Sequence, residues 1–136
     1  MRTYVMVAGA ALALLGCTTG VAPVSEVAEG ISVSTNRSSY AIGDAIELTI
    51  RNRSSKLVGY TLCPGTWERR QGDEWLRSEQ LMICADHLEQ LAAGSVRRES
   101  VEVPEGFEAG EHRLVVHLDR EDRSAVSNSF LIEPTD

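Results

Sequence analysis

Apolar and polar residues alternate in steps of two along most of the chain after residue 30, and this pattern limits the fold more than any other feature. Ile46, Leu48 and Ile50 alternate with Glu47 and Thr49. Successive side chains of a strand point to opposite faces, so the alternation predicts strands with one buried face. The same pattern recurs in short segments that Gly, Pro, Asn and Asp separate, at 31–33, 58–62, 66–70, 74–78, 96–103, 114–118 and 126–132.

About seven short strands of this kind predict an all-β fold, an antiparallel β-sandwich. A hairpin tip is expected at 71–74, where Gln-Gly-Asp-Glu lies between Trp67 and Trp75. Only residues 78–93 have apolar residues at helical spacing, so at most one short helix or turn is expected there.

The chain begins with an apolar segment of the kind that is removed after export. Residues 4–16 carry no charge and follow a single positive charge, Arg2. As a helix this segment would be ~20 Å long, too short for the ~30 Å hydrocarbon core of a bilayer. Its length is typical of the apolar region of a signal peptide. The alternatives are an ordinary secretory signal and a buried N-terminal helix.

The segment closes with LLGC at residues 14–17, which resembles the lipobox of bacterial lipoprotein signal peptides. The resemblance implies that residues 1–16 are removed and that Cys17 becomes the acylated first residue, carrying diacylglycerol and a fatty acid. The protein would then be anchored by lipid in the cell envelope. Thr18 follows the cysteine, which favours the outer membrane facing the periplasm. In an organism with one membrane, the outer face of the cell membrane is expected.

The residues after Cys17 differ in character from the rest of the chain. Residues 17–30 read CTTGVAPVSEVAEG and have no strand periodicity. They are interpreted as the lipidated cysteine and a flexible tether, which as a coil would span ~20 Å on average. The globular domain is therefore expected at 31–136.

The charge of the chain excludes one class of partner. Without Arg2 the mature protein would have 12 basic and 20 acidic residues, a net charge of −8. Such a domain repels the phosphates of nucleic acids. No Gly-rich phosphate loop is present, and no cofactor is expected.

Cys63 and Cys84 are the cysteines that remain once Cys17 is assigned to lipid. Disulfides form and persist outside the cytoplasm, so a Cys63–Cys84 bridge is predicted. It would close a loop of about 21 residues and contribute roughly 3 kcal/mol. The alternative is a metal site of Cys63, Cys84 and His87, but a zinc site normally needs a fourth ligand. No metal is therefore expected.

Several ordered motifs resemble bacterial Ig-like domains found in secreted lipoproteins. They are SYAIGD at 39–44, IELTIRN at 46–52, GYTLC at 59–63, WERR at 67–70, Trp75, Cys84, LAAG at 91–94, GEHRL at 110–114 and SNSF at 127–130. His112 stands where the family has the tyrosine of Gly-x-Tyr-Arg. The resemblance implies an Ig-like sandwich with a Cys63–Cys84 bridge and no established activity. The opening motif also resembles a bacterial proteinase-inhibitor domain of Ig-like type.

Nothing in the sequence predicts an enzyme. There is no Gly-x-Ser-x-Gly motif, and the bridge would leave no free thiol. His112 and His117 would point to opposite faces of a strand, and each histidine, His87 included, is expected at the surface.

Trp67, Glu68, Arg69, Arg70 and Trp75 are the predicted interaction surface. Trp67 and Arg69 share one face of their strand, opposite Glu68 and Arg70. An arginine lying on Trp75 would add a cation–π contact, and Trp and Arg are enriched at binding hot spots. The alternative is structural, with one tryptophan in the core and the arginines paired with acids.

The leading hypothesis is a non-catalytic, lipid-anchored Ig-like module that binds or scaffolds another envelope protein. One alternative is an extracytoplasmic proteinase inhibitor, with the loop between Cys63 and Cys84 as its stapled element. The other is a metal-binding envelope protein that uses His87 and the two thiols.

Overall fold

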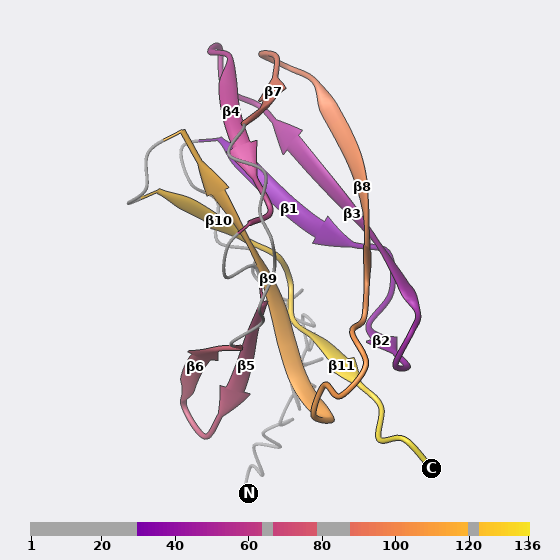
Figure 1. Ribbon diagram of the computed structural model, residues 1–136. Helices are drawn as coiled ribbons and strands as arrows, with labels where there is room; N and C mark the ends of the chain where they lie inside the picture. Colours follow the sequence, from indigo (N-terminus) through magenta and orange to yellow (C-terminus); the bar gives the residue numbers. More distant parts are fainter. Residues whose placement is uncertain (1–29, 64–66, 79–87, 120–122) are drawn as a thin grey trace, which may run out of the picture.

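The protein is an all-β sandwich of two facing sheets (Figure 1). The computed structural model describes residues 30–63, 67–78, 88–119 and 123–136. The expected signal peptide and all but the last residue of the tether lie outside these residues. The all-β expectation is confirmed. The described part of the chain contains no helix that is long and apolar enough to cross a membrane.

The described residues contain eleven short strands. They are β1 (Ile31–Thr35), β2 (Ser39–Tyr40), β3 (Ala45–Asn52), β4 (Val58–Thr61), β5 (Trp67–Gln71), β6 (Glu74–Arg77), β7 (Glu89–Leu91), β8 (Val96–Glu102), β9 (Gly110–Leu118), β10 (Ser124–Val126) and β11 (Phe130–Ile132). β7 occupies part of the segment for which a short helix was expected, so 89–91 form a strand instead. Residues 79–87 lie outside the described part.

The first sheet has the strand order β1-β3-β8, and both pairs are antiparallel. Ile46, Leu48 and Ile50 of β3 are fully buried, as the alternation predicts. Across the pairing with β1, Ile50 lies opposite Val33 and Asn52 lies opposite Ile31, and Val33 and Ile31 are also fully buried. One face of this sheet is therefore apolar and forms one side of the core.

The second sheet is built around the long strand β9. The first half of β9 pairs with β11 on one side and β5 on the other, and its second half pairs with β10 and β4. β7 extends the sheet from β4, and β6 extends it from β5. The chain supplies two short strands to each flank of β9, which explains why the elements outnumber the expected seven. β2 and β11 form the one parallel pair of strands within the described residues.

The core lies between the sheets and is made of side chains from both. Tyr40 and Phe130 meet edge to face with their ring centroids 5.3 Å apart. Tyr60 of β4 reaches across the sandwich and its hydroxyl donates to Glu99 of β8. Burial and the adjoining carboxylate raise the pKa of Tyr60 above its usual range. The phenol therefore stays protonated and serves as a donor.

The β5–β6 hairpin extends beyond the first sheet. It projects at the lower left of Figure 1, away from β1, β3 and β8. Its turn contains Gly72 at φ 62°, a conformation that favours glycine. The first sheet does not cover this hairpin. The inner face of the hairpin lies instead beside the connection between β8 and β9.

Candidate functional site

A layer of paired charges covers the outer face of β5, β6 and β9. Arg113 Nε lies 2.6 Å from Glu68 Oε2, and the Arg113 guanidinium lies 4.3 Å from the centre of the Trp75 ring. Arg70 and Glu111 are paired at 3.2 Å. We call these five residues the Trp75 face. It contains three members of the predicted interaction surface, Glu68, Arg70 and Trp75.

The predicted cation–π contact exists, but its cation is Arg113 rather than a residue of the Trp67–Arg70 segment. The strand register explains this, because Glu68 pairs with Arg113 across β5 and β9. Arg70 pairs with Trp75 across β5 and β6. Alternation along 110–118 places Glu111 and Arg113 on one face, but the sequence carries no signal for the pairing of β9 with β5.

Trp67 does not belong to an interaction surface. Its side chain is 2% exposed and lies in the core. It meets Phe107 and Phe130 edge to face, at centroid distances of 4.9 and 6.0 Å. A binding partner could not reach this ring. The prediction that Trp67 belongs to the interaction surface is therefore wrong, and Trp67 is the core tryptophan of the alternative interpretation.

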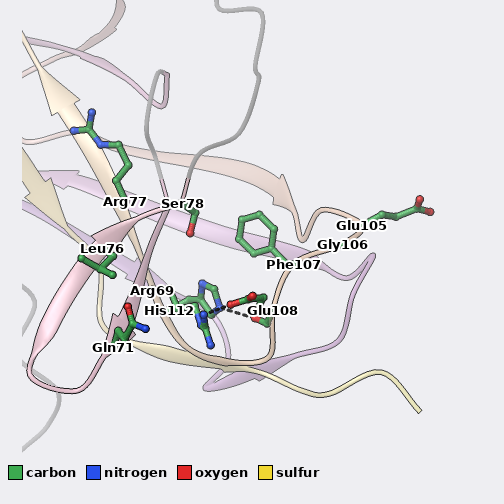
Figure 2. A pocket seen from close by; sticks show the side chains of 10 residues that line it. All are labelled: Arg69, Gln71, Leu76, Arg77, Ser78, Glu105, Gly106, Phe107, Glu108 and His112. Atoms are coloured by element: carbon green, nitrogen blue, oxygen red, sulfur yellow. Dashed lines mark hydrogen bonds and ion pairs between the residues drawn. The ribbon is translucent and has the colours of Figure 1, made fainter.

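Arg69 points to the inner face of the hairpin and lines a hollow of about 400 Å³ (Figure 2). Residues of the hairpin and of the β8–β9 connection form its walls, namely Arg69, Gln71, Leu76, Arg77, Ser78, Glu105, Gly106, Phe107, Glu108 and His112. Arg69 forms an ion pair with Glu108. Gly110, at the start of β9, has φ 137°, a conformation that favours glycine, whereas a Cβ there would only be in ordinary contact with Arg69 Nε at 3.6 Å.

His112 forms part of the hollow and is buried, which corrects the expectation of a surface histidine. Its side chain is 1% exposed, and its ring lies 5.4 Å from that of Phe107 at an interplanar angle of 30°. Nε2 lies 2.9 Å from the Glu108 carbonyl oxygen, to which it donates. Nδ1 is buried without a hydrogen-bond partner. His112 is thus an aromatic core residue.

Burial lowers the pKa of His112, and the nearby Arg69 guanidinium lowers it further. The hydrogen bond to the Glu108 carbonyl and the Glu108 carboxylate act in the opposite direction but do not outweigh burial. The imidazole is therefore neutral at pH 7. Arg69 and His112 together hold Glu108, so they fasten the β8–β9 connection onto the second sheet.

The other predicted sites fall at the limits of the described residues. Cys63 follows β4 and is half-buried, whereas Cys17, Cys84 and His87 lie outside the described part. Lipidation, the Cys63–Cys84 bridge and the alternative metal site therefore stay predictions. Within the described ranges, no three His, Cys, Asp or Glu residues are grouped so that they could hold a metal ion. His117 is half-buried on β9, where it pairs with Ser124 and Thr61.

Comparison of the chain with protein-family models and with curated proteins found no match.

Proposed function

We propose that this protein is a non-catalytic, lipid-anchored Ig-like module of the bacterial cell envelope, which binds another envelope protein. The observation that carries the proposal is the cysteine at the end of LLGC, residues 14–17, directly after an uncharged apolar segment. Acylation of Cys17 would hold the sandwich at a membrane by a tether.

The order of the strands supports the Ig-like part of the proposal. β1, β3 and β8 form one sheet, and β4, β9 and β10–β11 lie side by side in the other. The chain therefore passes between sheets after β1, β2, β3, β7 and β8. An Ig-like sandwich also alternates between its sheets, with the first, second, fourth and fifth strands in one and the third, sixth and seventh in the other.

The Trp75 face is the binding surface that we propose. It offers a half-buried indole and two arginine–glutamate ion pairs at fixed positions, and Leu131 adjoins it because Leu131 pairs with Glu111. Leu131 is 53% exposed. An apolar patch with aromatic and arginine side chains has the composition of a binding hot spot.

Intact mass spectrometry of the membrane-extracted protein tests the anchor. We expect the mass of residues 17–136 plus acyl groups on Cys17, less two hydrogens for a Cys63–Cys84 bridge. Cys17→Ser should keep the protein out of the membrane fraction, with Thr18→Ser as the matched control that stays in it. An unmodified, uncleaved chain would contradict the proposal.

Binding is tested by gentle crosslinking in native membranes followed by purification of the anchored protein. We expect a second protein in the product, and Arg70→Glu should reduce its yield because the substitution reverses a charge on the Trp75 face. Leu57→Ala, at an exposed site on the segment before β4, is the control. Recovery of the monomer alone would count strongly against a binding function.

A further inference from the structure

β6 has a free edge. Among the described residues β6 pairs only with β5, and the hairpin projects away from the first sheet (Figure 1). Leu76 in the middle of β6 is 45% exposed, although it is a large apolar residue. An exposed strand edge presents unpaired N–H and C=O groups to which another strand can bind.

The ladder with β5 shows which backbone groups of β6 are free. Ser78 N donates to the Trp67 carbonyl at 2.9 Å, and the register pairs Leu76 with Arg69. Hydrogen-bonded and non-hydrogen-bonded pairs alternate in an antiparallel ladder, so Ser78 and Leu76 face β5 with their N–H and C=O. Trp75 and Arg77 therefore point theirs away from β5, toward solvent.

We propose that a second copy of this chain occupies this edge, with β6 pairing antiparallel to β6 about a two-fold axis at Leu76. Directly opposite residues of an antiparallel pair lie on the same face of the sheet. Centring the axis on Leu76 puts Leu76 of the two copies opposite each other and Trp75 opposite Arg77 of the other copy. Trp75 and Arg77 are the residues with free backbone groups, so this register makes four hydrogen bonds between the copies.

The side chains are self-complementary in the same register. On the outer face, each Trp75 indole meets the Arg77 guanidinium of the other copy, and no ion pair engages Arg77 within the described residues. On the inner face, the two Leu76 side chains meet at the rim of the hollow that Leu76 and Phe107 line (Figure 2). A two-fold interface requires this kind of self-complementarity, because one patch must fit its own copy.

The longest edge strand, β8, is protected against the same pairing. Glu99 pairs with the fully buried Leu48, so its carboxylate is on the inner face, where it accepts from Tyr60. Arg97 pairs with Ile50 on that face and lies 3.9 Å from Glu89. Inward-pointing charges are a common device against edge-to-edge association. β6 carries an apolar residue, Leu76, at its centre instead.

Pairing of two four-residue strands makes a small interface, and small interfaces are weak. Stable dimerisation therefore rests on the proposed lipid anchor, because confinement to one membrane raises the effective concentration of the second copy. We expect a dimer at the membrane and mostly monomer in dilute detergent solution.

Oxidative crosslinking of the full-length chain on lipid vesicles tests the register. A non-hydrogen-bonded pair places the two Cα atoms about 4.5 Å apart, which suits a disulfide. We expect Leu76→Cys to form a covalent dimer in most of the protein, and Leu131→Cys to form no more than the wild-type chain. Equal crosslinking of the two variants, or none with Leu76→Cys, would overturn the proposal.

A second pair of variants separates the edge from the fold. Proline lacks the N–H group, so Arg77→Pro removes two of the four intermolecular bonds and none of those between β5 and β6. We expect Arg77→Pro to weaken dimerisation at least tenfold, measured by sedimentation at protein concentrations high enough for the wild-type chain to dimerise, and Arg77→Ala to weaken it less. An unchanged dimer with Arg77→Pro would reject this edge. If Cys17 is not acylated but Leu76→Cys still crosslinks at high protein concentration, the proposed lipid anchor is rejected and the proposed dimer is supported.

Discussion

Arg113 on β9 donates to Glu68 on β5 while its guanidinium lies over the Trp75 ring of β6. The donor–acceptor distance is 2.6 Å, and the two charged side chains are each 20% exposed. Three neighbouring strands are therefore joined on one face by a single arginine. Charge-assisted hydrogen bonds of this kind are stronger than neutral ones, particularly where water is partly excluded.

Replacing Arg113 by Gln should lower the free energy of unfolding by about 1–3 kcal/mol. The substitution removes a charge-assisted hydrogen bond and the cation–π contact and leaves the Glu68 carboxylate without its cation. Urea unfolding followed by tryptophan fluorescence measures the effect. Arg70→Gln is the matched control; its ion pair with Glu111 is more exposed, so a loss of about 0–1 kcal/mol is expected. Equal losses would contradict this role for Arg113.

Replacing Asn52, at the end of β3, should also lower the free energy of unfolding strongly. The side chain is fully buried; Nδ2 donates to the carbonyls of Lys56 and Leu91 at 2.8 and 3.0 Å, and Oδ1 accepts from Ser54 N at 2.9 Å. Asn52→Ala would leave buried backbone groups unpaired, so we expect a loss of about 2–4 kcal/mol. Ser54→Ala, which removes one hydroxyl at the edge of this network, should cost about 1 kcal/mol. Thermal denaturation of the two variants compares these losses.

Local periodicity was enough to predict most of the strands and their buried faces, although not β2 and β7. The alternation in 46–50 corresponds to β3, and the Gln-Gly-Asp-Glu stretch corresponds to the β5–β6 turn. Alternation also placed Trp67 and Arg69 on one face and Glu68 and Arg70 on the other. These features depend on residues that are near one another in the sequence, which is why the sequence could reveal them.

The contacts between the residues of the candidate site could not be predicted in the same way. Glu68 and Arg113 are 45 residues apart, and Arg69 and Glu108 are 39 apart. Their meeting depends on the pairing of β5 with β9, which no local pattern encodes. His112 was expected at the surface because it is polar. It is buried because it lies on the inner face of β9, where Phe107 and Trp67 cover it.

The buried imidazole of His112 predicts a pH dependence of stability. Burial holds the pKa of His112 below its ordinary value of 6.5, so the unfolded chain binds more protons than the folded chain in the window between the two values. Stability therefore rises with pH across that window, is greatest above 6.5 and falls on acidification.

Urea unfolding at intervals between pH 7.5 and 5 should show this decline, with a slope of at most about 1.4 kcal/mol per pH unit from one proton. His112→Gln should flatten the curve, because glutamine does not titrate. The Arg69 guanidinium lowers the pKa of His112 and the Glu108 carboxylate raises it, so Arg69→Gln should raise that pKa toward 6.5 and make the decline smaller without removing it. An equally steep curve for His112→Gln would assign the dependence to other groups.

Gly59 on β4 is expected to tolerate no side chain, because its neighbours occupy the space. A Cβ there would lie 2.6 Å from Asp119 Oδ1 and 3.1 Å from Leu88 Cδ1, and the same carboxylate accepts from the Gly59 N–H. Gly59→Ala should therefore displace Asp119, break this hydrogen bond and cost about 1–3 kcal/mol. Asp119→Ala removes the obstructing oxygen, so Gly59→Ala should cost less in that background. A double-mutant cycle in urea measures the coupling. Additive losses would show that the two residues do not act through this contact.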